Sequence, residues 1–345
     1  MCTLITAPYS PIGGVTTFVN SIVPEFKGRT IIFRRGKRIE KNIVINYLSL
    51  VLSPLRFFCY LLYYNPSKVI INTSLSNSLL YRDGIFVIVA KILKKDILLV
   101  IHGFKEKSLV HKKLLKLGYF RANAICVLSE SYKNAIVEAG YKGNTYTQFN
   151  PVSKDILYIK DEKYPSLSRL LFMGRIETAK GIYISLDVFR TLKKRHPEIL
   201  FDIVGIGSEY ENVLQYIKDN DIEGITMYGF KSGDEKKRIL MNNAITLLPS
   251  YNEGLPISIL EAMAVGQLVI TRPIGGIVDL YQHCNFGKLI SSSRAKDFAE
   301  AYEELIANPE KVILTRMRNR EFAREHFSPQ AIANNIERIF DEMQK

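Results

Sequence analysis

The chain has 345 residues, more than one ordinary hydrophobic core needs, so about two domains are expected. Its four cysteines are scattered and form no CxxC pair, which argues against a disulfide scaffold and fits a reducing cytosol. The formal net charge is +13, yet the sequence has no helix-turn-helix, zinc-finger or RNA-recognition motif, and nucleic-acid binding is disfavoured.

The excess of basic over acidic residues is confined to the first half of the chain. Residues 1–150 contain 21 Lys and Arg against 7 Asp and Glu, whereas residues 151–345 contain 26 against 27. Each basic side chain near an anionic leaflet contributes about 1 kcal/mol. We therefore expect this half to dock peripherally on the cytoplasmic face of a membrane and to bind a lipid diphosphate-linked acceptor. A basic surface that only aids solubility is the alternative.

Two segments bear on membrane insertion. The first ten residues lack a basic stretch and contain Pro8, so no signal peptide is predicted. The apolar segment 43–64 is long enough to cross a bilayer, but Asn46, Pro54 and Arg56 interrupt it. This pattern favours a helix packed on a sheet.

Apolar runs of strand length alternate with helical patterns in both halves. This alternation is typical of doubly wound α/β domains. The first half has such runs at 2–7, 69–72, 97–101 and 124–128, and the second at 170–172, 201–204, 225–228 and 244–248. A polar stretch after Asn150 and Pro151 marks the junction, so we expect domains at 1–155 and 156–345 and a last helix over about 329–344.

In the first half, a glycine loop and a histidine follow predicted strands. Gly13 and Gly14 precede a helical pattern, where glycine lets a backbone approach a ligand, although a plain tight turn is as good an interpretation. His102 follows the run at 97–101 and is either a site residue or a structural histidine.

In the second half, Arg175 and Lys180 lie between a predicted strand and a helix. A planar guanidinium and a compact ammonium there could neutralise a diphosphate, whereas isolated surface charges would be solvated. The loops at Gly205 and at Gly229-Phe230 also end strands, where ligands of parallel sheets bind. No full dinucleotide fingerprint is present, so an oxidoreductase is disfavoured.

The segment 250–266 contains two carboxylates around a predicted helix start. Glu253 precedes the helix, and Glu261 lies about 7 Å along it at 1.5 Å per residue from Pro256. The free N–H groups of a helix start suit a phosphate, and a carboxylate can accept protons from two hydroxyls. Either glutamate alone would be read as a surface residue.

A D-x-D sequence raises the question of a metal. Asp219-Asn220-Asp221 follows a predicted helix at 213–218, whereas a D-x-D sequence that binds a metal is expected to follow an apolar strand. We therefore predict no metal site.

The segment from Glu253 through Ala264 resembles the E-x7-E signature of family 4 retaining glycosyltransferases, and 174–181 resembles the G-R-x-x-x-x-K-G of that family. The resemblance implies the GT-B fold, with two doubly wound Rossmann-like domains facing each other across a cleft. The first would bind the acceptor and the second the nucleotide sugar, and the terminal helix would pack back on the first domain.

The resemblance also implies roles for the candidate residues. A sugar would pass with retained configuration from a nucleotide diphosphate sugar to a hydroxyl of a lipid-linked glycan, in bacterial-type surface polysaccharide synthesis. No metal and no cofactor other than this donor are implied. A sugar-nucleotide epimerase or phosphorylase of the same fold is the alternative. The implied catalytic residues are His102, Arg175, Lys180 and Glu253, and the implied donor-binding residues are Gly13, Gly14, Arg175, Lys180, Gly205, Gly229, Phe230, Glu253, Gly254, Leu255 and Glu261.

Overall fold

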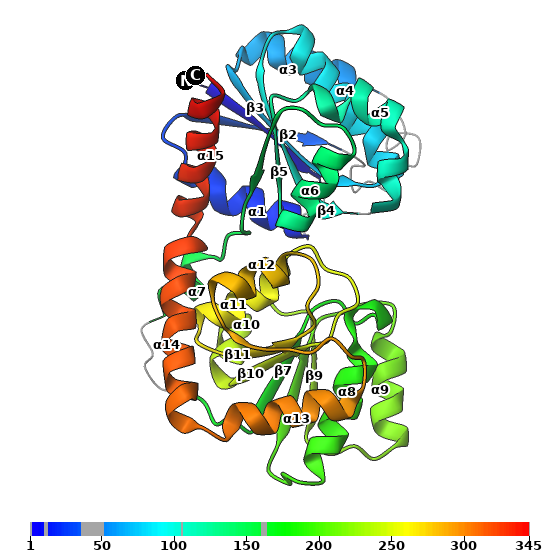
Figure 1. Ribbon diagram of the computed structural model, residues 1–345, viewed down its shortest axis with the longest axis vertical. Helices are drawn as coiled ribbons and strands as arrows, with labels where there is room; N and C mark the ends of the chain where they lie inside the picture. The colour runs from blue at the N-terminus through cyan, green and yellow to red at the C-terminus, as the bar shows by residue number, and fades with distance from the viewer. Residues whose placement is uncertain (1, 10–12, 36–51, 105, 160–163, 345) are drawn as a thin grey trace. The chain divides into compact units, whose positions relative to one another are not determined.

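The computed structural model describes residues 2–9, 13–35, 52–104, 106–159 and 164–344 (Figure 1). The chain divides into two units, residues 1–151 with 329–345, and residues 152–328. The boundary therefore falls at Pro151, four residues before the expected one, because the polar stretch begins with the short helix α7 (Lys154–Leu157), whose Ile156 and Leu157 are buried in the second unit.

The first unit is a doubly wound α/β domain with one parallel sheet. Its strand order is β2-β1-β3-β4-β5-β6. The strands are β1 (Cys2–Pro8), β2 (Arg29–Arg35), β3 (Lys68–Leu75), β4 (Asp96–Phe104), β5 (Ala124–Val127) and β6 (Asn144–Thr147). The helices are α1 (Gly14–Ile22), α3 (Ser53–Tyr64), α4 (Asn77–Ile92), α5 (Lys112–Leu117), α6 (Glu130–Glu138) and α15 (Pro329–Met343).

Alternate residues of each strand in this unit enter different cores. Leu4 packs in the core under α3, α4 and α5, whereas its neighbour Ile5 packs in the core under α1 and α15. Both faces of a parallel sheet are thus covered, which is why these strands appear in the sequence as unbroken apolar runs. Helix α15 supplies Ile332, Ile336 and Ile339 to the second of these cores.

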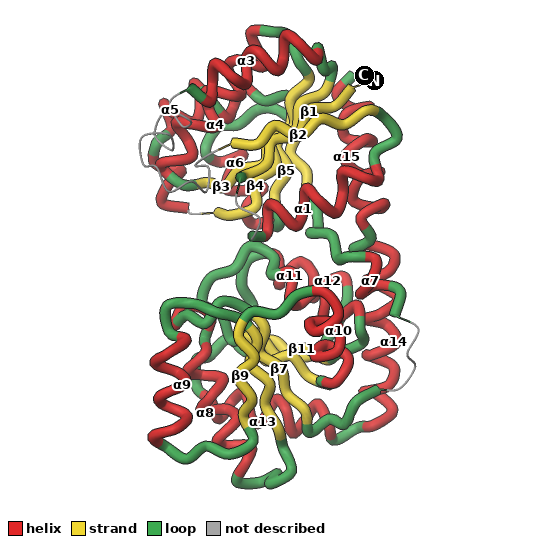
Figure 2. The backbone as a smooth tube through the Cα atoms, turned by 180° about the vertical axis from the view of Figure 1, so that it is seen from behind, coloured by secondary structure: helices red, strands yellow, loops and turns green. Residues whose placement is uncertain are grey.

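The second unit repeats this architecture. Its strand order is β12-β11-β10-β7-β8-β9, and all pairs are parallel. Helices α8 and α13 form one layer against the sheet, and α11 and α14 form another (Figure 2). The strands are β7 (Arg169–Met173), β8 (Leu200–Val204), β9 (Ile225–Gly229), β10 (Ile245–Leu248), β11 (Leu268–Thr271) and β12 (Gly287–Leu289). The helices besides α7 are α8 (Ile182–Lys193), α9 (Tyr210–Asp219), α10 (Gly233–Asn242), α11 (Ile257–Ala264), α12 (Gly276–His283), α13 (Ala295–Ile306) and α14 (Pro309–His326).

The predicted strands are confirmed, and the one at 97–101 is longer than expected. Strand β4 continues through His102 and Gly103 to Phe104, because pairing with β3 extends to Leu75 opposite Phe104. The apolar segment expected to be a packed helix is partly described. Its portion from Ser53 forms α3, with Phe57 and Leu61 in the core, and residues 43–51 lie outside the described residues. None of the described helices is both long and apolar enough to span a bilayer.

Candidate functional site

The strand order of the second sheet reverses between β7 and β10. The chain starts in the middle with β7, proceeds outward through β8 and β9, and then returns to place β10 on the other side of β7. The carboxyl ends of such a pair splay their loops apart, and ligands of open α/β sheets bind there. The loop after β7 carries Arg175 and Lys180, and the loop after β10 carries Glu253. Topology thus brings the two sequence motifs to one edge.

The loop between β10 and α11 is held from both sides by backbone contacts that only glycine allows. Gly181 has φ +75°, and a Cβ there would lie 2.3 Å from the carbonyl oxygen of Pro249. Gly275 has φ +49°, and a Cβ there would lie 2.1 Å from the carbonyl oxygen of Glu253. The Gly276 amide also donates to the Gly254 carbonyl oxygen at 2.6 Å. These contacts fix the backbone that carries Glu253.

Lys180 and Glu253 form the centre of the candidate site. Lys180 Nζ lies 2.6 Å from Glu253 Oε1, and the two side chains are 13% and 11% exposed. Ser250 Oγ donates to the same carboxylate oxygen at 3.0 Å, and Lys180 Nζ donates to the Asn252 carbonyl oxygen at 3.3 Å. A largely buried ion pair with additional hydrogen bonds holds both groups in defined positions. The lysine could bind a phosphate and the carboxylate a sugar hydroxyl.

Arg175 lies apart from this ion pair. Its guanidinium Nη1 is 2.6 Å from Glu177 Oε1, and the side chain is 67% exposed. The structure therefore places Arg175 and Lys180 in two separate ion pairs. Glu177 was not among the predicted residues, since nothing in the sequence distinguishes it from a solvated loop carboxylate. An exposed arginine is free to turn toward an arriving anion, because an exposed ion pair contributes within about 1 kcal/mol.

Glu261 is the second carboxylate of this segment, and it is buried. It lies on α11, its residue is 5% exposed, and its Oε1 is 2.6 Å from Lys236 Nζ on α10. Sequence reasoning missed Lys236, because the polar run from Gly233 to Arg238 is typical of a solvated helix and the pairing spans 25 positions of the chain.

The backbone around the two glycine loops is tightly packed. The Gly205 amide donates to the Gly229 carbonyl oxygen at 2.8 Å, and a Cβ on Gly205 would lie 1.8 Å from the Gly174 carbonyl oxygen. Phe230, directly after β9, is 51% exposed and offers a ring surface. Leu255, in contrast, is 4% exposed, so its contribution is restricted to its backbone.

Helix α11 begins next to this loop. Its N-cap is Pro256, whose side chain has no oxygen that could cap the first amides. The Ile259 amide donates to the Pro256 carbonyl oxygen at 3.1 Å, so the amides of Ile257 and Ser258, which precede it, are the ones that suit an anion.

The remaining predicted residues belong to the first unit. His102 Nε2 is 2.8 Å from Asn72 Oδ1, and Phe18 packs edge-on against the imidazole with ring centroids 4.6 Å apart. Burial lowers the pKa of His102 to about 4, so the imidazole is neutral at pH 7. Gly13, with φ +146°, is the N-cap of α1, and Gly14 is the first residue of that helix.

The D-x-D sequence has the structure that was predicted for it. Asp219 is the last residue of α9, and Asp221 adopts a left-handed turn with φ +46°. Within the described ranges, no three His, Cys, Asp or Glu side chains gather as a metal site would require. Whether the reaction needs a metal stays a prediction.

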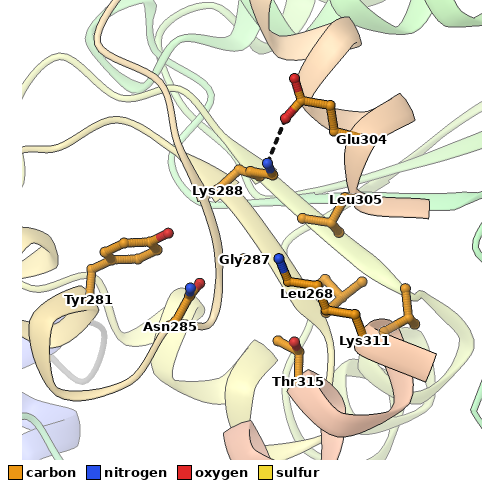
Figure 3. Close-up of a pocket in the computed structure, with 10 residues that line it drawn as sticks. Leu268, Tyr281, Asn285, Gly287, Lys288, Glu304, Leu305, Lys311 and Thr315 are labelled. Atoms are coloured by element: carbon orange, nitrogen blue, oxygen red, sulfur yellow. Dashed lines mark hydrogen bonds and ion pairs between the residues drawn. The ribbon is translucent and has the colours of Figure 1, made fainter. Parts of the chain in front are cut away.

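A pocket of about 100 Å³ lies at the opposite edge of the second sheet. Leu268 and Gly287 begin β11 and β12, so the pocket is at the amino ends of these strands. Lys288 and Glu304 form an ion pair of 2.6 Å on its wall (Figure 3). Because parallel sheets bind ligands at the carboxyl edge, this pocket is distinct from the candidate site.

Comparison with known proteins finds similar chains and similar folds. Residues 158–326 match the family described as Glycosyl transferases group 1. An uncharacterised glycosyltransferase of Methanocaldococcus jannaschii is 24% identical over 99% of both chains. The amylovoran biosynthesis glycosyltransferase AmsK of Erwinia amylovora is 32% identical over 41% of this chain and 37% of its own. The crystal structure of Anabaena HepE in complex with UDP and glucose has a TM-score of 0.75 at 15% identity, covering 98% of this chain and 99% of that one.

These matches agree with the two six-stranded parallel sheets. The fold is GT-B, with two Rossmann-like domains. The protein is an enzyme, a glycosyltransferase, and its residues 158–326 are similar to the group 1 family.

Proposed function

We propose that the protein is a family 4 retaining glycosyltransferase. It moves a hexose-type sugar from a nucleotide diphosphate donor to a hydroxyl of a lipid-linked glycan during polysaccharide synthesis. The observation that carries this proposal is the Lys180–Glu253 pair at the switch point of the second sheet, next to the start of α11. The similar protein HepE binds UDP and glucose in its crystal structure, which supports a nucleotide sugar donor, and the similar protein AmsK acts in amylovoran biosynthesis, which supports a polysaccharide product.

Donor binding would exchange the partners of the buried ion pair. The diphosphate takes the ammonium of Lys180, and Glu253 then accepts hydrogen bonds from sugar hydroxyls. Arg175 leaves Glu177 for the phosphates at little energetic cost, because it is exposed. The backbone amides near Gly254 and Leu255 also point to the phosphates, while Glu261 accepts hydrogen bonds from the ribose. The loops at Gly205 and at Gly229-Phe230 lie on the side of the nucleoside base.

The same residues support chemistry without a metal. The bond between the anomeric carbon and the β-phosphate oxygen breaks, and the acceptor oxygen forms a bond to that carbon on the same face. The acceptor proton passes to the departing phosphate oxygen. Lys180, Arg175 and the amides stabilise the charge that develops on the diphosphate. In this proposal His102, which is neutral at pH 7, orients the donor sugar through a hydrogen bond.

The first unit carries features that support docking on an anionic membrane. Its helix α3 buries Phe57 and Leu61 but exposes Leu55, Leu62 and Tyr63, the last at 82%. Exposed apolar side chains on a strongly basic domain fit an interfacial contact, in which area and charge both contribute.

The docking proposal is tested by flotation with anionic liposomes. We expect association that decreases with salt, and a further decrease in a Leu62→Ser/Tyr63→Ser variant. Leu314→Ser on α14 of the second unit is the matched control, since Leu314 is 62% exposed and should not matter. Flotation that is absent at low salt contradicts docking.

The transfer proposal is tested by a panel of nucleotide sugars with chelator present. We expect one donor to raise the melting temperature and to be hydrolysed slowly without acceptor, with the released sugar in the anomeric configuration of the donor. A free sugar isomer or a sugar phosphate as the sole product would indicate the epimerase or phosphorylase instead. Loss of turnover in chelator, restored by a divalent cation, would overturn the metal-independent part.

A further inference from the structure

The ion pair between Lys236 and Glu261 joins two helices on either side of β10 along the chain. Lys236 is on α10, which precedes β10, and Glu261 is on α11, which follows it. Their Nζ and Oε1 atoms are 2.6 Å apart, and their side chains are 25% and 6% exposed. Among the residues that the structure describes, Lys236 makes the one side-chain hydrogen bond to this carboxylate.

A buried carboxylate needs such a partner to remain charged and in place. Burial without a counter-charge disfavours the ionised form, and an unpaired side chain would sample other rotamers. The contact of Lys236 at Oε1 restricts the rotation of the carboxylate. A carboxylate offers about four acceptor positions, so an ammonium and two hydroxyls can be bound together.

We propose that Lys236 is a positioning residue for nucleotide recognition. It holds Glu261 in a fixed orientation, so that the carboxylate accepts hydrogen bonds from the vicinal hydroxyls of the donor's ribose. This inference rests on the proposed function, since it assigns Glu261 to a ribose. In this proposal Lys236 has a different role from Lys180 and Arg175. Lys180 and Arg175 bind the phosphates, whereas the ammonium of Lys236 contacts a carboxylate that binds hydroxyls.

The test measures how strongly the enzyme distinguishes ribose from deoxyribose. The full-length protein is titrated by calorimetry with UDP, GDP, ADP and CDP, and the tightest binder is then compared with its 2′-deoxy and 3′-deoxy forms. A hydrogen bond to a charged acceptor corresponds to about 10- to 100-fold in affinity, and the wild type should lose that much with one or both deoxy forms.

Lys236→Met should weaken the ribonucleotide by about 10-fold while leaving the deoxy forms nearly unchanged, so that the discrimination falls below about 3-fold. Lys236→Arg keeps a cation and should keep most of the discrimination. Lys237→Met is the matched control, because it makes the same change one residue further along α10 without touching Glu261.

A stabilising pair with no role in binding would behave differently. If Lys236 positions Glu261, the Lys236→Met/Glu261→Gln variant, which removes both charges, should have a higher melting temperature than Lys236→Met but should still fail to distinguish ribose from deoxyribose. If Lys236→Met distinguishes ribose from deoxyribose as the wild type does, the positioning role is wrong while nucleotide binding stands. If none of the four ribonucleotides binds the wild type, the proposed function itself fails.

Discussion

Replacing Lys180 by Met should damage both stability and turnover, and the two effects can be separated. The lysine is 13% exposed and pairs at 2.6 Å with a glutamate that is 11% exposed. Its removal takes the ammonium away from a largely buried carboxylate, which we expect to lower the free energy of unfolding by about 2–4 kcal/mol. Arg175→Met is the comparison, since Arg175 is 67% exposed and its loss should stay within about 1 kcal/mol.

The two substitutions should differ in their effect on stability but not in their effect on turnover. Both cations are proposed to stabilise the leaving diphosphate, so each substitution should lower kcat by about 100- to 1000-fold, as the loss of one preorganised charge contact does. Urea unfolding gives the stabilities, and release of nucleoside diphosphate gives the rates at a temperature where both variants are folded. In Lys180→Met/Glu253→Gln, stability should recover and turnover should not. Near-normal turnover of folded Lys180→Met would refute the assignment, and equal destabilisation by the two single substitutions would refute the burial argument.

Two further substitutions test the backbone and the histidine. Gly275→Ala places a Cβ 2.1 Å from the Glu253 carbonyl oxygen, and it should lower the free energy of unfolding by about 2–4 kcal/mol and abolish donor binding. Gly233→Ala is the control, because Gly233 also has a positive φ but a Cβ there would have no atom within 4 Å, and it should cost about 1 kcal/mol. Equal melting temperatures of the two variants would contradict this. His102 titrates near pH 6.5 in the unfolded chain and near 4 when buried, so the unfolded chain binds the extra proton between these values and stability falls as pH drops through them. Relative to His102→Gln, the wild type should lose about 2 kcal/mol between roughly pH 7.5 and 5 in urea unfolding, with His111→Gln as the exposed control; an unchanged difference would show that His102 is not buried as neutral.

The strands were predictable because parallel strands covered on both faces consist of continuous apolar residues. The run at 97–101 shows the limit of this signal. Its apolar pattern stops at His102, but the backbone pairing with β3 continues, and pairing leaves no mark on side-chain type. The unit boundary was displaced for a similar reason, because Ile156 and Leu157 are two buried residues within a polar stretch.

The candidate site was predictable where local spacing determines position. Glu253 and Lys180 follow strands, and strand order alone brings them to one edge. The direct ion pair between them, the turn of Arg175 to Glu177 and the contact of Lys236 with Glu261 were not predictable. These three contacts depend on side-chain rotamers or on the positions of α10 and α11. The spacing of residues in the sequence determines neither the rotamers nor these positions.

The return of α15 to the first unit has a consequence for biosynthesis. Ile332, Ile336, Ile339 and Phe340 complete a core whose other members, such as Ile5 and Val19, leave the ribosome some three hundred residues earlier. While residues 152–328 are being made, this face of the first sheet is covered by α1 but not yet by α15. The nascent chain thus carries a partly open apolar surface until α15 is made.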